Sequence, residues 1–449
     1  MFVFFKYLKY IINYSKISYN LIKLYFNNDL MENKDYIENL VNVISDNGCM
    51  LVKCIQWSIP KYKMIYSNND IINKLEIFYD KCKVHKTSYT EELYENDFKK
   101  SIYDDYFIND LIGSGSIGQV YCVTNKNDKK KYALKVIHPD VDYEFCIFKI
   151  FFLFFYKIIL YKYDLVSDIN IFMTNIENQL DYKKEALNCK RMYEMYKDVK
   201  YINIPKVKFS TKNIIIMDYL DMNSSNKINE ETQLYNKYKC LILLITFINN
   251  SCYNGFSHGD MHMGNWSMNF KEYNYINIVD LGFCFDIDKN DFYNIDSYVN
   301  KPNSLDRIKE LIKHIKNNHI CNNKSIDIEL ISNELYEKVK DYKVLEKNIK
   351  QLLQICVKYK IKVKSSIFNT LFLFYQLSSI FEYLFTDNDG TRKNNNYIEN
   401  NLSLEIINYC NTYNIFEEYK EYLSNNIVKI TQFKLTNSKY EKYKNLCLN

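Results

Sequence analysis

Short hydrophobic runs separated by turn residues mark residues 106–137 as a region of β-structure. The runs extend over 107–112, 121–124 and 132–136, and the polar segment 125–130 joins the last two. Runs of this length, bounded by polar and glycine-rich stretches, are typical of strands. We therefore predict three consecutive strands in this part of the chain.

Longer segments with helical periodicity precede and follow these strands. Residues 35–60 predict two helices separated by a break at Asn47-Gly48, and further helices are expected at 180–195 and 230–255. Most of 300–449 also has a helical pattern, with 366–385 as its most hydrophobic part. A group of strands among many helices predicts an α+β fold class.

The first 28 residues predict a helix with one polar stripe on an otherwise hydrophobic surface. The stripe recurs at steps of four and three residues and contains no acidic residue: Lys9, Asn13, Lys16, Asn20, Lys23 and Asn27. One interpretation is a basic amphipathic helix that lies on a membrane surface or directs the chain to an organelle. The other is a helix packed on the protein with a solvated polar face, and the sequence leaves both open.

A second hydrophobic segment, 145–161, approaches the length of a transmembrane helix. Lys149 and Lys157 interrupt it, and it lies between predicted elements of one domain. We expect a buried or membrane-apposed helix here, and no membrane span.

Composition and charge narrow the functional classes. The chain has 449 residues and a net charge of +5 with both signs interspersed, so no nucleic-acid partner is expected. The 13 cysteines are scattered without metal-ligand spacing, which indicates a reducing compartment, cytoplasmic or organellar. Seven of the nine glycines lie between Gly113 and Gly282, where we expect them to meet backbone requirements.

The turn between the first two predicted strands contains three of these glycines. Residues 113–120 have the sequence Gly-Ser-Gly-Ser-Ile-Gly-Gln-Val. The G-x-G-x-x-G-x-V spacing also occurs in dinucleotide-binding turns, but there a helix follows, whereas here a strand follows. Lys135 lies fifteen residues after Val120 on the third strand. This arrangement predicts a hairpin loop that covers phosphates, with Lys135 beneath it.

A second set of polar residues lies within 256–282. The segment 258–265 places Asp260 five residues before Asn265, and Asp280 follows fifteen residues later. Protein-kinase catalytic loops share the step from Asp to Asn and the downstream Asp. Phosphoryl transfer uses one carboxylate near the attacking hydroxyl, with an Asn and an Asp as metal ligands. Taken alone, however, the segment also fits an ordinary turn rich in Asp, His and Gly.

Four motifs together resemble those of the UbiB family of atypical kinases, also called the AarF-domain or ADCK family. Residues 53–56 resemble the family's K-x-G-Q, and 116–120 match its S-I-G-Q-V. Residues 180–186, Leu-Asp-Tyr-Lys-Lys-Glu-Ala, resemble L-D-[FY]-x-x-E-A, and 258–265 resemble H-A-D-P-H-P-G-N. The resemblance extends over roughly residues 35–290.

The resemblance implies a bilobal protein-kinase-like fold with a small β-rich N-lobe, a helical C-lobe and a helical N-terminal extension. It implies ATP and Mg²⁺ as cofactors and ATPase or small-molecule kinase activity, with a link to membranes, lipids and quinone synthesis. Lys135 and Glu185 would form an ion pair, although Glu185 also fits a surface position on a charged helix. Asp260 would be the catalytic-loop acid, and Asn265 and Asp280 the magnesium ligands.

Two further groups of residues complete the expected site. Nucleotide contacts are expected from the glycine-rich loop, the lysine strand and the segment between the lobes, at Gly113, Ser114, Gly115, Ser116, Gly118, Val120, Lys135, Met217 and Asp218. A regulatory segment would involve Lys53, Gln56, Gln179 and Asp181.

The motifs depart from the family pattern at four places. Glycines and serines occupy 113–116 where the family has an alanine-rich loop, and Met261 and Met263 replace two prolines. Ile55 replaces the glycine of K-x-G-Q, and Gln179 replaces the first acid of the family's E-x-D. Because that acid would hold the lysine of K-x-G-Q, we expect Lys53 and its segment to be held more loosely in this chain.

These inferences divide the chain into four parts. Residues 1–34 are the amphipathic basic helix, 35–105 the helical extension, 106–220 the N-lobe and 221–449 the C-lobe. The expected partners are a nucleotide, an unidentified small-molecule, lipid or protein acceptor, and a membrane surface. Two alternatives stay open: a pseudokinase scaffold without turnover, and an aminoglycoside- or choline-kinase-like phosphotransferase, whose H-G-D-x-H-x-x-N loop also fits 258–265.

Overall fold

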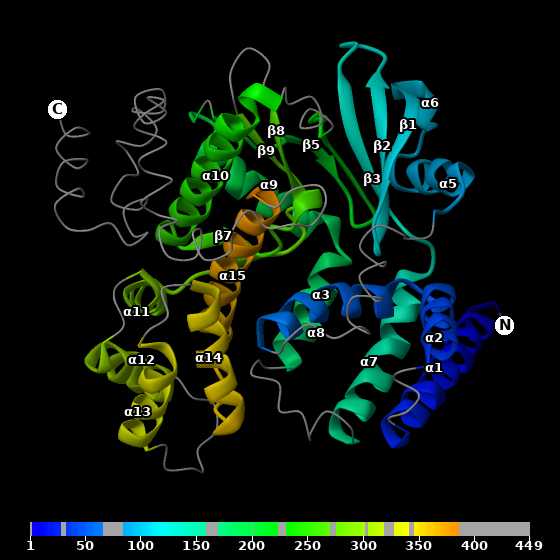
Figure 1. The fold of residues 1–449 in the computed structure, drawn as a ribbon. Coiled ribbons are helices and arrows are strands. Elements are labelled where there is room, and N and C mark those ends of the chain that lie inside the picture. The colour runs from blue at the N-terminus through cyan, green and yellow to red at the C-terminus, as the bar shows by residue number, and fades with distance from the viewer. Residues whose placement is uncertain are drawn as a thin grey trace. The chain divides into compact units, whose positions relative to one another are not determined.

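The computed structural model describes residues 2–27, 33–65, 84–158, 169–199, 201–222, 230–269, 275–300, 304–317, 327–340 and 345–385. The chain divides into two compact units (Figure 1). Unit 1 comprises Met1–Asp164, Ile169–Lys190 and Lys206–Tyr219, and unit 2 comprises Leu165–Asp168, Arg191–Pro205 and Leu220–Asn449. Unit 1 thus contains the N-terminal helices together with most of the predicted N-lobe. The four boundaries drawn from the sequence stay predictions.

Unit 1 contains a five-stranded antiparallel sheet in the order β1-β2-β3-β6-β5. Its strands are β1 (Tyr106–Ser114), β2 (Gly118–Asn125), β3 (Lys131–Ile137), β5 (Val207–Ser210) and β6 (Ile214–Asp218). Successive side chains on a strand point to opposite faces. Leu134 and Val136 accordingly pack in one hydrophobic cluster with Tyr94, whereas Ala133 packs in another with Ile215. The three strands predicted within 106–137 are confirmed.

Helices surround this sheet and account for most of unit 1. They are α1 (Phe2–Phe26), α2 (Lys34–Asn47), α3 (Cys49–Ile65), α5 (Thr87–Phe98), α6 (Ile102–Asp105), α7 (Val141–Ile158), α8 (Ile169–Gln179) and the first part of α9 (Tyr182–Tyr196). The break predicted at Asn47-Gly48 is the boundary between α2 and α3. Within the described residues, no helix has both the length and the hydrophobicity that crossing a membrane requires.

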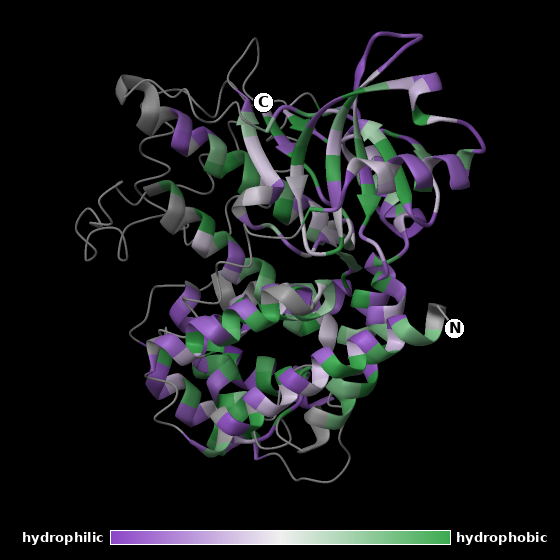
Figure 2. Cartoon of the chain, turned by 90° about the vertical axis from the view of Figure 1, so that its right-hand side faces the viewer, coloured by the Kyte–Doolittle hydropathy of each residue, from purple (hydrophilic) through white to green (hydrophobic). Residues whose placement is uncertain are grey.

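Helix α1 is packed on one side and exposed on another. Tyr10, Tyr14 and Ile17 are buried, and Lys6 forms a 2.5 Å ion pair with Asp140 at the start of α7. A second apolar stripe is exposed, and hydrophobic and hydrophilic residues are interspersed along this helix near the label N (Figure 2). The helix therefore packs on unit 1 along its buried side, while a second stripe of its surface is exposed.

Unit 2 combines helices with two small sheets. Its strands are β4 (Ile202–Asn203), β7 (Phe256–His258), β8 (Trp266–Asn269), β9 (Tyr275–Ile278) and β10 (Cys284–Asp286), and one 3-10 turn, η5, spans Met263–Asn265. One sheet has the order β4-β9-β8, and the other pairs β7 with β10. The helices are α10 (Glu230–Tyr253), α11 (Lys289–Asn300), α12 (Leu305–Asn317), α13 (Ile328–Val339), α14 (Leu345–Lys358) and α15 (Ser365–Phe385). Small, mainly antiparallel sheets among many helices confirm the predicted α+β class.

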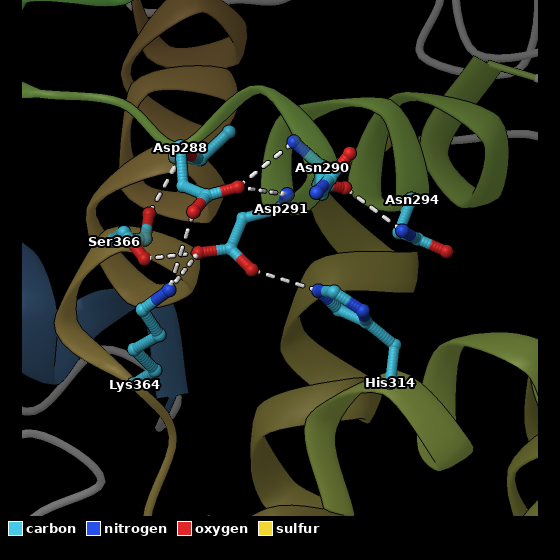
Figure 3. Close-up of polar contacts among 8 residues, drawn as sticks. Asp288, Asn290, Asp291, Asn294, His314, Lys364 and Ser366 are labelled. Atoms are coloured by element: carbon cyan, nitrogen blue, oxygen red, sulfur yellow. Dashed lines mark hydrogen bonds and ion pairs between the residues drawn. The ribbon is translucent and has the colours of Figure 1, made fainter. Parts of the chain in front are cut away.

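A buried carboxylate joins three of the helical segments of unit 2 (Figure 3). The side chain of Asp291, on α11, is 2% exposed. It accepts hydrogen bonds from His314 of α12 at 2.8 Å and from the Ser366 hydroxyl of α15, and it pairs with Lys364 at 3.0 Å. A buried carboxylate stabilises a fold only when its oxygens are satisfied, so these donors fix the helices around Asp291.

Candidate active site

The glycine-rich loop of unit 1 joins β1 to β2 in a tight hairpin. The Gly115 amide donates to the Gly118 carbonyl at 2.9 Å, which closes the turn. A Cβ atom at Gly118 would lie 2.1 Å from the Tyr182 hydroxyl and 2.4 Å from the Val136 carbonyl oxygen. Because the Val136 oxygen is main chain and cannot swing away, only glycine permits this approach of the loop to β3.

His138, which follows β3, anchors the same loop. Its Nε2 atom donates to the Gly115 carbonyl at 3.0 Å, and its main-chain amide donates to the Ile117 carbonyl at 2.8 Å. With the proton on Nε2, its Nδ1 atom accepts from His85 Nδ1 at 2.8 Å. Burial lowers the pKa of both imidazoles, and that of His85 to about 4. Both rings are therefore neutral near pH 7, where they hold the loop.

Lys135 on β3 and Glu185 on α9 form a buried ion pair. The distances from Lys135 Nζ to the two carboxylate oxygens are 2.8 Å and 2.9 Å. The lysine side chain is 13% exposed and the glutamate side chain 3%. Asp181 accepts a hydrogen bond from the Lys183 amide at 3.0 Å in the first turn of α9, and so stabilises the start of the helix that presents Glu185.

The sheet register brings other expected nucleotide-binding residues beside Lys135. Val120 on β2 lies directly opposite Lys135, and Met217 on β6 lies opposite Ala133. Asp218, at the end of β6, is exposed and accepts a hydrogen bond from the main chain of Lys206 at 3.2 Å. The glycine-rich loop, the lysine strand and the end of β6 therefore belong to one continuous sheet.

The predicted regulatory residues are only partly brought together. Gln56 of α3 accepts a hydrogen bond from the Ser116 hydroxyl of the glycine-rich loop at 2.9 Å. Gln179 is buried and donates to the Asn175 carbonyl of its own helix at 3.1 Å. Within the described residues, Lys53 and Gln179 form no hydrogen bond with each other. The link between α3 and the loop thus passes through Gln56.

In unit 2, His258 connects the predicted catalytic loop to the segment that carries Asp280. Its Nδ1 atom accepts from the Asp260 amide at 3.0 Å, so the proton is on Nε2, which donates to the Val279 carbonyl at 3.1 Å. The ring is fully buried, and burial lowers its pKa. A neutral His258 therefore fixes the main chain next to both Asp260 and Asp280.

The amide of Asn265 is oriented by the same loop. Its Nδ2 atom donates to the Asp260 carbonyl at 2.8 Å, which leaves Oδ1 as its acceptor atom. The Val279 amide donates a hydrogen bond to the Asn265 carbonyl at 2.9 Å. Asp280 is the next residue in the chain, so this hydrogen bond holds its main chain close to Asn265. Asp260 Oδ2 lies 3.9 Å from His262 Nε2. The three predicted polar residues thus share one loop assembly.

The chemistry of these side chains fits magnesium. Mg²⁺ prefers oxygen ligands, keeps several waters and is commonly bound by one or two carboxylates together with substrate phosphates. Asn265 and Asp280 offer amide and carboxylate oxygens, and Asp280 is exposed. The described residues contain no group of three or more His, Cys, Asp and Glu that could hold a metal by themselves. A site completed by phosphate and water matches this donor set.

Sequence reasoning missed two features of the glycine-rich loop. Neither the anchoring by His138 and His85 nor the bond from Ser116 to Gln56 was predicted. Gln56 and Ser116 are 60 positions apart, and His85 and His138 are 53 apart. No local signal in one sequence connects residues at such separations, because the pairing follows from how α3 and the sheet pack.

Comparisons with known proteins agree on one family. The family model described as the ABC1 atypical kinase-like domain matches residues 78–309, just over half of the chain. An uncharacterised aarF domain-containing chloroplastic protein kinase of Arabidopsis thaliana is 24% identical over 165 residues. That match covers 34% of this chain and 22% of the plant protein, so this chain spans only a small part of that relative.

A solved structure is also similar. The complex of Rv3197 with erythromycin from Mycobacterium tuberculosis has 17% sequence identity to this chain and a TM-score of 0.44. The match covers 67% of this chain and 83% of that one.

Proposed function

Because this chain belongs to the ABC1 atypical kinase-like family, which confirms the resemblance drawn from its motifs, we propose that it binds ATP with Mg²⁺ and transfers or hydrolyses the γ-phosphate. The observation that carries the proposal is the buried pair of Lys135 and Glu185 beside a glycine-rich hairpin. In kinases the corresponding pair orients the lysine toward the nucleotide phosphates.

The residues have distinct roles in this proposal. Main-chain amides of the loop 113–118 other than that of Gly115, together with the ammonium of Lys135, bind phosphate oxygens. Asp260 lies near the attacking hydroxyl or water and accepts its proton. Asn265 and Asp280 would hold Mg²⁺, which neutralises charge on the phosphates when bound. His258 keeps the main chain of both acids in register through its two ring nitrogens.

The two alternatives make different predictions. A pseudokinase scaffold would bind nucleotide without turnover, whereas an aminoglycoside- or choline-kinase-like enzyme would phosphorylate a small polar alcohol. The segment 116–120 and its contact with Gln56 favour the atypical kinase over the aminoglycoside- or choline-kinase-like enzyme, because these features belong to the motifs that define the resemblance. The presence of the phosphate-handling residues argues against the pseudokinase. Because the resemblance implies a link to lipids and quinone synthesis, we propose a lipid or quinone-related molecule as the acceptor. Lipid and metabolite profiles of cells that produce wild-type or Asp260→Asn protein would identify it.

Mg-ATP is expected to raise the melting temperature of the full chain. A ligand that binds only the folded state at 100 times its Kd stabilises it by about 2.7 kcal/mol. Differential scanning fluorimetry with Mg-ATP, ATP with EDTA, and Mg²⁺ alone would test this, with the largest shift expected for Mg-ATP. Equal melting temperatures with and without millimolar Mg-ATP would contradict the proposed function.

We further propose that the exposed stripe of α1 binds an anionic membrane surface. Its large apolar residues are exposed and follow steps of three and four, except for one step of eight across Ser15: Phe4, Leu8, Ile11, Tyr19, Ile22 and Phe26. Lys9, Lys16 and Lys23 are also exposed and recur every seven residues beside them, and α1 contains no acidic residue. An apolar stripe flanked by lysines suits the boundary between acyl chains and anionic headgroups.

The triple variant Lys9→Gln/Lys16→Gln/Lys23→Gln is expected to bind anionic vesicles much more weakly than the wild type. Each lysine near such a surface contributes about 1 kcal/mol, and the buried side of α1 does not contain these residues. Flotation with phosphatidylserine-containing and neutral vesicles measures the effect, and Lys86→Gln serves as an exposed control outside α1. Equal flotation of wild-type and triple variant, or no flotation of either, would reject the membrane proposal.

A further inference from the structure

A buried carboxylate from a distant helix caps the N-terminus of α3. Glu144, on α7, is 1% exposed. One carboxylate oxygen accepts from the Met50 amide at 2.7 Å, and the other accepts from the Cys49 amide at 2.9 Å. The Tyr14 hydroxyl of α1 donates to the carboxylate at 3.0 Å. The first amides of a helix lack intrahelical partners, so Glu144 supplies the cap that the residue before α3 cannot provide.

Gly48 precedes α3 and makes room for this carboxylate. Its φ is +133°, a conformation that side chains rarely adopt, and a Cβ atom would lie 2.4 Å from a Glu144 oxygen. Burial raises the pKa of Glu144 to about 6, while its three hydrogen bonds favour the charged form. The group is therefore ionised near pH 7.5, where its charge also interacts favourably with the helix dipole.

Helix α3 connects this cap to the glycine-rich loop. Gln56 lies two helical turns after Cys49 and accepts the hydrogen bond from the Ser116 hydroxyl at 2.9 Å. Because a helix is rigid over two turns, displacement of its N-terminus would move Gln56 relative to the loop. The cap, the helix and the loop all lie within unit 1.

We propose that Glu144 is a positioning residue that fixes α3 so that Gln56 holds Ser116 in a conformation suited to binding nucleotide. Tyr14 links α1 to this arrangement, because its hydroxyl donates the third hydrogen bond to the Glu144 carboxylate. This inference rests on the proposed nucleotide binding. It adds that the packing of α1 and α3 determines the conformation of the glycine-rich loop.

Glu144→Gln is the decisive variant. Glutamine keeps the size but has one acceptor oxygen, and its NH2 group would face the Cys49 amide, donor against donor. We expect faster hydrogen exchange in peptides spanning 48–56 and 113–120 without nucleotide, and about fivefold weaker Mg-ATP binding, the size of a lost helix cap. Tyr14→Phe keeps both amide caps and is expected to show smaller changes in the same two peptides. Asp142→Asn, an exposed acid on the same helix, is the control without effect.

A double variant separates positioning from a general loss of stability. Gln56→Ala alone is expected to weaken Mg-ATP binding about as much as Glu144→Gln, and the combination is expected to add little. Multiplicative effects of the two changes, or unchanged exchange in 113–120 for Glu144→Gln, would overturn the inference. If wild-type protein binds no Mg-ATP, the proposed function fails, whereas the exchange experiment without nucleotide still decides whether Glu144 controls the loop.

Discussion

Lys135→Met is expected to lower the local stability of unit 1 by about 3–5 kcal/mol and to remove the stabilisation by Mg-ATP. Removing one partner of a buried ion pair leaves an uncompensated buried charge, which has a cost of this size. Here the remaining charge would be Glu185, whose side chain is only 3% exposed. Hydrogen exchange in peptides spanning 131–137 and 182–190 would report the loss locally, since a chain with two units need not unfold in one step.

A second substitution distinguishes the two parts of this prediction. In Lys135→Met/Glu185→Leu the buried charge is gone, and apolar replacements of a buried pair are often neutral or stabilising. We expect exchange to return toward the wild-type rate while Mg-ATP still causes no thermal shift. Lys131→Met, an exposed lysine on the same strand, is the matched control and should retain both properties. A double variant that still responds to Mg-ATP would show that Lys135 does not contact the nucleotide.

Asp280→Asn is expected to reduce ATP turnover by at least about 100-fold while leaving the fold intact. Asp280 has a φ of +56°, in the left-handed region that Asn adopts readily and most other residues do not. The substitution therefore keeps the backbone conformation, removes the negative charge and replaces one acceptor oxygen with an NH2 donor. Losing one group that stabilises charge in the transition state reduces rates by about 100- to 1,000-fold.

Turnover of labelled ATP measured across a magnesium titration would test this expectation. Weaker metal binding should appear as a need for more Mg²⁺ as well as a lower maximal rate. Asp286→Asn is a matched control, because this carboxylate is 77% exposed and pairs with Arg191 at the surface, where such pairs contribute little. Wild-type turnover in Asp280→Asn would remove Asp280 from the proposed metal site, and no turnover in wild-type protein would favour the pseudokinase.

The sequence by itself determined local elements and supplied the residue types of the candidate site. Strand periodicity predicted β1, β2 and β3, and the spacing of Asp260 and Asn265 predicted a compact loop. These features are local: a turn, a strand or a five-residue step depends on neighbours in the chain. The motifs also identified the family, because their order along the chain is more specific than any one of them.

Only the tertiary structure decided which distant residues meet. Gln179 occupies the position of the acid that would hold Lys53, and it donates to Asn175 in its own helix, while Gln56 accepts from Ser116. Glu144 carried no motif, and its role at the start of α3 follows from the packing of α7 against that helix. Such contacts depend on how side chains fill the space between helices and strands, so they can be identified only once the fold is known. The same packing gave α1 a buried side and an exposed side, which its polar stripe alone left undecided.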